Sequence, residues 1–268
     1  MKVELPESGS EAPSVLSFSM AKAGSTLLYN ILSQLAPTQG LVYFSIEDYL
    51  FAHNVSPTNR PGGVGKIIRP AGYCYGGFRQ YPAFPVPIIG SAKITFLVRD
   101  PRDMITSLYF SLLSSHGIPA DQAAAASGPV PGPASASAKM LETRAMLKKI
   151  DVNAFARQAI RTYMRIFEGY IAQGFARRDN VAIYRYEDVI FAKEAWIKDI
   201  CEWYGWDVDL ATQTRIAAMF DERPDEERPL EHVRQVKPGN HLAYFAPATI
   251  DAINDALSEY MRLFGYLG

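Results

Sequence analysis

The stretch VLSFSMAKAGSTLLYNILSQL, residues 15–35, decides the fold class. Its first five residues are apolar or small, as in a short buried strand, and residues 20–24 form a turn of small residues around Lys22. From Ser25 onward the apolar residues recur at helical spacing, at Leu27, Leu28, Ile31, Leu32 and Leu35. The stretch therefore predicts a strand, a tight loop and a helix, which together open an α/β fold.

A second unit of this kind begins at residues 93–98, KITFLV, which are rich in β-formers and bounded by turn residues. Asp100 is suited to cap the next helix, and Pro101 is tolerated at its first position, where the missing N–H has no partner to lose. This helix is expected to continue through Leu113.

The rest of the chain repeats this alternation. Further helices are predicted over about 152–175, from after residue 188 to about 204, over 210–220 and over 247–264. Strands are predicted at 181–184 and, more weakly, at 66–69. Residues 41–51 are left unassigned, and 55–90 are otherwise expected to be loops. Strands that alternate with helices predict a three-layer α/β fold, with a mostly parallel central sheet flanked by helices.

One domain is expected over residues 1–268, with a polar leader at 1–13. Residues 117–139 are a low-complexity run of Ala, Ser, Gly and Pro with little to bury, and we expect a mobile loop there. No signal peptide and no apolar run of membrane-spanning length is found, so a soluble, cytoplasmic protein is expected.

Charge and cysteine content exclude several classes of protein. The 27 Lys and Arg nearly balance the 28 Asp and Glu, giving a net charge of −1, whereas a nucleic-acid-binding surface needs a basic excess. The two cysteines, Cys74 and Cys201, are too few for a disulfide framework or a cysteine-based zinc site. No metal site and no nucleic-acid partner are predicted, but a basic pocket for a small anion is compatible with this balance.

The loop around Lys22 has the features of an anion site. A strand that ends in a small-residue turn and opens a helix directs main-chain N–H groups and the positive end of the helix dipole at the turn. Lys22 adds a charge, and Ser25 and Thr26 add hydroxyl donors. It is not a Walker A loop, because Lys22 precedes Gly24 instead of following it. The alternative is an ordinary helix cap with a solvated lysine.

Arg99 supplies a second candidate anion ligand. It leaves the end of the predicted buried strand, where open α/β sheets bind ligands, and its guanidinium suits phosphate. Ser107 lies eight positions on, in the following helix, and offers a further hydrogen bond. The alternative is a surface ion pair between Arg99 and Asp103.

These motifs resemble the sulfotransferase family that uses 3′-phosphoadenosine 5′-phosphosulfate (PAPS). Its PKxGTT signature is similar to residues 21–26, AKAGST, and its RNPxDxxxSxY signature to residues 99–109, RDPRDMITSLY. Tyr186, in YRYEDV, falls where family members carry a tyrosine near the adenine. The segment VRQVKPGNHLAYF, residues 233–245, resembles RKGxxGxW, although Val236 and His241 replace its glycine and tryptophan.

The resemblance implies a P-loop-NTPase-like sulfotransferase fold and a role for each matched residue. Lys22, with Ala23, Gly24, Ser25 and Thr26, would bind the 5′-phosphosulfate, and Lys22 would stabilise the departing phosphate during in-line transfer. Arg99 and Ser107 would bind the 3′-phosphate, with Arg234, Lys237 and Gly239 completing its site. PAPS would be the co-substrate and PAP the product, with no metal. The acceptor would be a hydroxyl or amine of a small molecule or a saccharide.

The general base is left open. Many family members carry a histidine in a KTH segment, but residues 69–79, RPAGYCYGGFR, contain none. Glu47, Asp48 and His53 are the upstream candidates, with Glu47 or Asp48 slightly favoured, and His116 and His241 are others. The aromatic side chains of Tyr73, Tyr75, Phe78 and Tyr81 either line an acceptor pocket or pack their loop.

Two other functions remain as alternatives: a small-molecule kinase with a variant phosphate loop, and a PAP-binding protein without catalysis. Magnesium-dependent ATP binding would indicate the first, and PAP binding without transfer the second. A homodimer is also left open.

Overall fold

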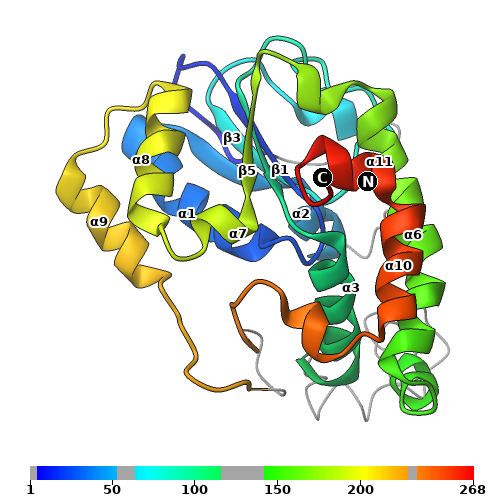
Figure 1. Ribbon diagram of the computed structural model, residues 1–268. Helices are drawn as coiled ribbons and strands as arrows, with labels where there is room; N and C mark the ends of the chain where they lie inside the picture. The colour runs from blue at the N-terminus through cyan, green and yellow to red at the C-terminus, as the bar shows by residue number, and fades with distance from the viewer. Residues whose placement is uncertain (1–4, 53–63, 116–141, 229–233) are drawn as a thin grey trace, which may run out of the picture. The chain divides into compact units, whose positions relative to one another are not determined.

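The computed structural model describes residues 5–52, 64–115, 142–228 and 234–268. The chain divides into two compact units, and Figure 1 labels most of their helices and strands. The first consists of Met1–Arg99 and Ile166–Glu222, and the second of Asp100–Arg165 and Arg223–Gly268. That residues 1–268 form one domain stays a prediction, and residues 117–139, expected to be a mobile loop, lie outside the described part.

The first unit is built on a five-stranded sheet of order β2-β3-β1-β4-β5, in which every neighbouring pair is parallel. This confirms the predicted fold class. The strands are β1 (Val15–Ser19), β2 (Val42–Ser45), β3 (Tyr73–Phe78), β4 (Ile94–Val98) and β5 (Val181–Arg185). The helices that follow them are α1 (Ser25–Leu35), α2 (Ile46–Ala52), α7 (Tyr186–Val189), α8 (Lys193–Tyr204) and α9 (Leu210–Met219).

Helices cover both faces of this sheet because side chains alternate between its two sides. On one face, Phe96 stacks on Tyr170 of α6 (Val152–Ala172), with 4.7 Å between ring centroids. On the other face, the next residue back, Thr95, hydrogen-bonds the hydroxyl of Tyr204 in α8 at 2.8 Å. Buried aromatic side chains thus join the sheet to both helical layers.

The predicted strand at 66–69 is wrong, since residues Val64–Ile67 form a 3₁₀ turn, η2. The hydroxyl of Tyr75 donates to the carbonyl of Ile67 at 2.8 Å and accepts from the N–H of Arg69 at 2.9 Å. A side chain thereby satisfies main-chain groups that a strand ladder would otherwise pair.

The missing strand is β3, in a region that sequence patterns assigned to loops. Tyr73, Tyr75 and Phe78 are buried in it, so they pack the core instead of lining an acceptor pocket. Its Gly76 and Gly77 allow close packing: a Cβ on Gly76 would lie 2.5 Å from the Tyr43 hydroxyl. The unassigned stretch 41–51 contains β2 and the start of α2.

The second unit is helical. It contains α3 (Pro101–Phe110), the π-turn η3 (Ser111–Ser115), most of α6, the 3₁₀ turn η6 (Asn240–Ala243), α10 (Pro247–Ala256) and α11 (Ser258–Leu263). The helix expected at 247–264 is thus two helices that meet at Leu257. The predicted cap of α3 is confirmed, because the Asp100 carboxylate accepts from the N–H of Arg102 at 2.9 Å.

No helix among the described residues combines the length and apolar character that crossing a bilayer requires.

Candidate active site

The carboxyl ends of the five strands bring five candidate segments of the first unit to one edge of the sheet. Because all strands run parallel, the residue that follows each strand lies at this edge, where open α/β sheets bind their ligands. The turn at 20–24 follows β1, Glu47 lies one residue into α2 after β2, and Arg79, Arg99 and Tyr186 follow β3, β4 and β5.

The turn after β1 has a strained backbone. Lys22 has φ 70°, and among the described residues it is the one non-glycine residue with positive φ. For an L-residue this left-handed conformation is unfavourable, and such strain persists only where the surroundings hold it. The N–H of Ala23 donates to the carbonyl of Met20 at 3.0 Å, which closes the turn.

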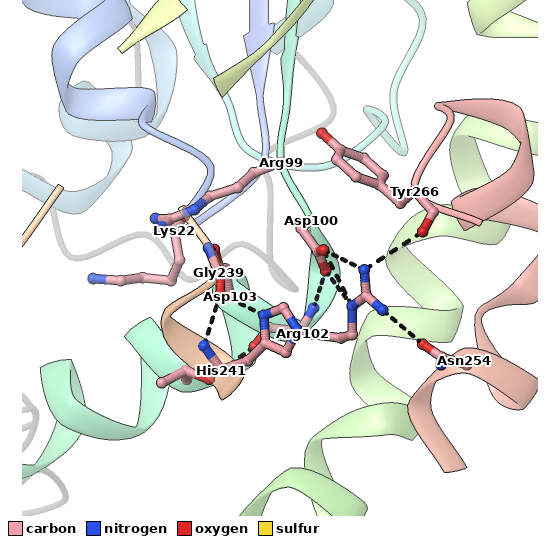
Figure 2. Close-up of polar contacts among 10 residues, drawn as sticks. Lys22, Arg99, Asp100, Arg102, Asp103, Gly239, His241, Asn254 and Tyr266 are labelled. Atoms are coloured by element: carbon pink, nitrogen blue, oxygen red, sulfur yellow. Dashed lines mark hydrogen bonds and ion pairs between the residues drawn. The ribbon is translucent and has the colours of Figure 1, made fainter. Parts of the chain in front are cut away.

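Arg99, which follows the neighbouring strand β4, holds the strained Lys22 in place. Its Nη1 donates to the Lys22 carbonyl at 3.1 Å, and its guanidinium lies 4.2 Å from the ring centroid of Tyr186. Arg99 and Tyr186 are buried, with 6% and 5% of their surfaces exposed. Figure 2 shows Arg99 and Lys22 side by side. Three residues predicted to bind the nucleotide are therefore in one cluster.

Position 24 requires glycine, both for its backbone conformation and for the space around it. Its φ is 92°, and a Cβ there would lie 2.9 Å from Cδ2 of Tyr186 and 3.1 Å from Cδ2 of Leu97. The Tyr186 ring thus packs directly on the turn, and any side chain at Gly24 would displace it.

Helix α1 begins at this turn without a side-chain cap hydrogen bond. Its first helical bond runs from the N–H of Leu28 to the carbonyl of Gly24 at 3.1 Å, so the N–H groups of Ser25 and Thr26 lie in the uncapped first turn. Ser25 is buried and Thr26 is exposed. An anion at this terminus would accept hydrogen bonds from these groups and meet the positive end of the helix dipole.

Two of the candidate bases lie at the start of α2, beside Arg79. The carboxylate of Glu47 lies 3.7 Å from Nε of Arg79 and accepts weakly from its main-chain N–H at 3.4 Å. Asp48 lies 3.7 Å from Nη2 of Arg79 and accepts from the Ser45 hydroxyl at 2.6 Å. The side chain of Glu47 is 16% exposed and that of Asp48 is 65% exposed, so Glu47 is the more sheltered carboxylate.

Tyr29 of α1 ties the ends of β1 and β3 together beside these carboxylates. Its hydroxyl lies 3.4 Å from the carbonyl oxygens of both Ser19 and Phe78. Burial and the charge of Glu47 raise the pKa of Tyr29 far above its usual value, so it stays a neutral donor.

In the second unit, Arg102 connects the start of α3 to the C-terminal segment. Its guanidinium binds the Asp100 carboxylate at 2.6 Å, donates to Oδ1 of Asn254 at 3.2 Å and reaches the carbonyl of Tyr266 at 3.4 Å. Figure 2 shows this fork. Through Arg102, the N-cap residue Asp100 is linked to the C-terminal segment as well as to α3.

Asp103 binds the segment that resembles the phosphate-closing loop. Its side chain is fully buried, and its oxygens accept from the N–H of Gly239 at 2.7 Å and of His241 at 2.9 Å (Figure 2). The Nδ1 atom of His241 lies 2.7 Å from the same carboxylate. A surface role for Asp103, the alternative offered by the sequence, is therefore wrong.

Arg234 is buried against aromatic rings of the second unit. Its guanidinium lies 4.3 Å from the ring centroid of Phe110 and 5.8 Å from that of Tyr244, and it forms an ion pair with Glu227. Glu227 also accepts from the Tyr244 hydroxyl at 2.7 Å. A residue predicted to bind phosphate thus already contacts a carboxylate.

The remaining predicted site residues are accessible or lie outside the described part. Ser107 and Gly239 are partly exposed, and Lys237 is exposed. Among the base candidates, His53 and His116 lie outside the described residues. His241 is buried against Asp103. Within the described residues, no three His, Cys, Asp or Glu side chains are grouped so as to hold a metal ion.

Sequence reasoning missed Arg79 and Glu227 as functional candidates, and it did not find the role of Asp103 in holding the segment at Gly239 and His241. Asp103 was visible as a matched motif position, but its partners lie more than 130 residues away. Arg79 and Glu227 carried no motif signal.

Comparison with known proteins identifies relatives for this geometry. A family model described as the sulfotransferase domain matches residues 80–265. Mouse sulfotransferase SULT7A1, solved in complex with PAP, superposes with a TM-score of 0.58 at 16% identity, covering 93% of this chain and 85% of that one. Retinol dehydratase, solved with androsterone and the inactive cofactor PAP, superposes with a TM-score of 0.56 at 14% identity, covering 92% and 80%. No curated protein matches the chain.

Proposed function

The chain belongs to the sulfotransferase domain family, and from this premise we propose that it transfers a sulfuryl group from PAPS to a hydroxyl or amine. The observation that carries the proposal is the strained Lys22 turn at the uncapped start of α1, held by Arg99 at the carboxyl edge of the sheet. Its acceptor is a small molecule or a saccharide. The androsterone-bound relative supports a small hydroxyl acceptor.

The 5′-phosphosulfate fits the first turn of α1. It would accept hydrogen bonds from the N–H groups of Ser25 and Thr26, with further donors from their hydroxyls. Gly24 leaves no side chain between this turn and Tyr186, whose ring supports the turn and Arg99. Ala23 is buried and contributes main chain alone.

The proposed ligands of the 3′-phosphate are Arg99 in the first unit and, in the second, Ser107, Arg234, Lys237 and Gly239. Each assignment rests on the family signature at that position. Burial of Arg99 and Arg234 supports them, because a guanidinium in a low-dielectric setting binds phosphate more strongly than one in water. Tyr186 is proposed to lie near the adenine, as its position in the family implies, and its ring contacts Arg99.

In the proposed reaction the acceptor oxygen or nitrogen forms a bond to sulfur while the bond from sulfur to the bridging oxygen of the 5′-phosphate breaks. The acceptor proton goes to a base, and PAP leaves with the negative charge that develops on the bridging oxygen. The ammonium of Lys22 stabilises that charge, as cationic groups do in phosphoryl transfer. Glu47 is the proposed base, because it lies at the same sheet edge and is more sheltered than Asp48.

Calorimetry separates this function from its two alternatives. The proposed enzyme binds PAP without magnesium, with a Kd of about 1 μM, corresponding to about −8 kcal/mol. ATP binding that requires magnesium, together with absent PAP binding, would instead indicate a kinase. PAP binding with no PAP release from labelled PAPS, across a panel of phenols, alcohols, amines and saccharides, would indicate a binding protein without catalysis.

We expect Glu227→Gln to tighten PAP binding about fivefold, a gain of about 1 kcal/mol. The Glu227 carboxylate occupies the guanidinium of Arg234 and would repel an incoming phosphate. The measurement is the Kd for PAP by calorimetry. Glu226→Gln is the matched control, because it removes the same charge from an exposed neighbour and should leave the Kd unchanged. Equal or weaker binding by Glu227→Gln would contradict this role.

A further inference from the structure

Three side chains on α3 form one stripe along the helix. Asp103, Ser107 and Phe110 stand at positions i, i+4 and i+7, which lie on the same helical face. Asp103 and Phe110 each hold part of the segment 234–244, and Ser107 stands between them.

At one end of the stripe, Asp103 binds three donors of this segment. Two are the main-chain N–H groups of Gly239 and His241, at 2.7 and 2.9 Å, and the third is the His241 ring. Gly239 has φ 80°, a left-handed turn that glycine adopts without strain. The carboxylate therefore fixes both sides of the turn that starts η6.

At the other end, Phe110 supports Arg234, with the guanidinium 4.3 Å from the ring centroid. The same ring packs edge-on against Tyr244, with 4.7 Å between centroids. Contacts at Asp103 and Phe110 thus hold the segment at both ends along the α3 stripe that carries Ser107.

We propose that Asp103 is a positioning residue for nucleotide binding, which fixes the segment from Arg234 to Gly239 against the face of α3 that carries Ser107. Its buried carboxylate touches no nucleotide and acts through the N–H groups of Gly239 and His241. The inference rests on the proposed function, because it assigns the positioned residues to the 3′-phosphate of PAPS. It also gives His241, which replaces the tryptophan of the family signature, a defined role as the third donor.

Asp103→Asn is the direct test. An amide in place of the carboxylate removes the charge and sets an NH₂ group against one of the donors, so one hydrogen bond becomes a repulsive contact. We expect the Kd for PAP and the KM for PAPS to rise at least tenfold, while the acceptor KM stays within twofold. Asp251→Asn is the matched control, since that exposed aspartate lies on α10 of the same unit.

Two substitutions at His241 test the same proposal if Asp103→Asn fails to fold. In His241→Asn the side-chain N–H replaces the Nδ1 donor, so PAP affinity should stay within about threefold of wild type. In His241→Leu that donor is lost while the N–H groups of Gly239 and His241 still bind the carboxylate, so the Kd should rise about tenfold, which corresponds to about 1.4 kcal/mol. A general loss of packing would affect both variants alike.

Hydrogen exchange gives a readout that needs no nucleotide. The amides of Gly239 and His241 should exchange at least tenfold faster in Asp103→Asn, while amides in the middle of α6 keep their wild-type rates. Wild-type protein that fails to bind PAP would overturn the proposed function. Wild-type protein that binds PAP, with Asp103→Asn and His241→Leu binding it equally well, would overturn the positioning role alone.

Discussion

Lys22→Ala is expected to lower kcat for PAP formation about 10³-fold, which corresponds to about 4 kcal/mol of lost transition-state stabilisation. The ammonium is the group proposed to meet the charge that develops on the bridging oxygen as the bond to sulfur breaks. Because this charge is larger in the transition state than in bound PAPS, the loss should fall on kcat more than on the KM for PAPS.

The backbone of Lys22 complicates a single substitution, and a second variant resolves the difficulty. At φ 70° any L-residue is strained, whereas glycine is not. Lys22→Gly therefore removes the ammonium and relieves the strain at once, and the carbonyl that accepts from Arg99 is present in both variants. We expect Lys22→Gly to be as inactive as Lys22→Ala but to have the higher Tm.

These two variants, with Lys22→Arg, separate charge from conformation. Arginine keeps a cation with a different reach, so partial activity is expected, at roughly a tenth to a hundredth of wild type. Tm by thermal unfolding and kcat with labelled PAPS are the measurements. Wild-type turnover in either neutral variant would show that Lys22 has no part in the transfer. Activity that follows Tm across the series would assign Lys22 a conformational role instead.

The strand and helix around Lys22 were predictable because their signals are local. The apolar run of β1, the small-residue turn and the spacing of α1 all lie within 21 residues, and each agrees with the others. The Asp100 cap of α3 was predictable for the same reason, since its partner is two residues away. All three elements, β1, α1 and α3, begin where the sequence patterns predict.

Strand β3 was not predictable because its signal depends on its neighbours. Gly76 and Gly77 weaken a strand in isolation, but here they admit the Tyr43 hydroxyl and the start of α2, whose Glu47 nitrogen would lie 2.7 Å from a Cβ on Gly77. The Tyr75 hydroxyl hydrogen-bonds the carbonyl of Ile67 and the N–H of Arg69, so these main-chain groups do not pair in the strand predicted at 66–69. Contacts with residues outside each segment decided both elements.

The same distinction applies to the candidate site. The motif positions of Lys22, Arg99 and Tyr186 were identified from the sequence, but not the bond from Arg99 to the Lys22 carbonyl, which joins residues 77 apart. Nor does any pattern reveal that Glu227 pairs with Arg234. Sequence signatures identified the residues proposed to bind the nucleotide, whereas the contacts that hold these residues in place are visible only in the structure.

Glu47→Gln is the second substitution for which a large effect is expected, a fall in kcat of about 10²- to 10⁴-fold, the range in which a positioned general base contributes. The amide keeps the size of the side chain and its capacity to accept from the Arg79 N–H, so the fold and the KM for PAPS should change little. The loss should be greatest for acceptors whose hydroxyl proton is least acidic, because these depend most on a base.

Asp48→Asn supplies the control, since Asp48 is the adjacent carboxylate, faces the same arginine and is 65% exposed. If Glu47 is the base, Asp48→Asn should keep kcat within about threefold, because an exposed carboxylate contributes little to a proton transfer in a sheltered site. The reverse pattern would transfer the role to Asp48. Wild-type kcat in both variants would exclude both carboxylates as the base, and His53→Ala, measured with the same acceptors, would then identify the base or remove the last upstream candidate.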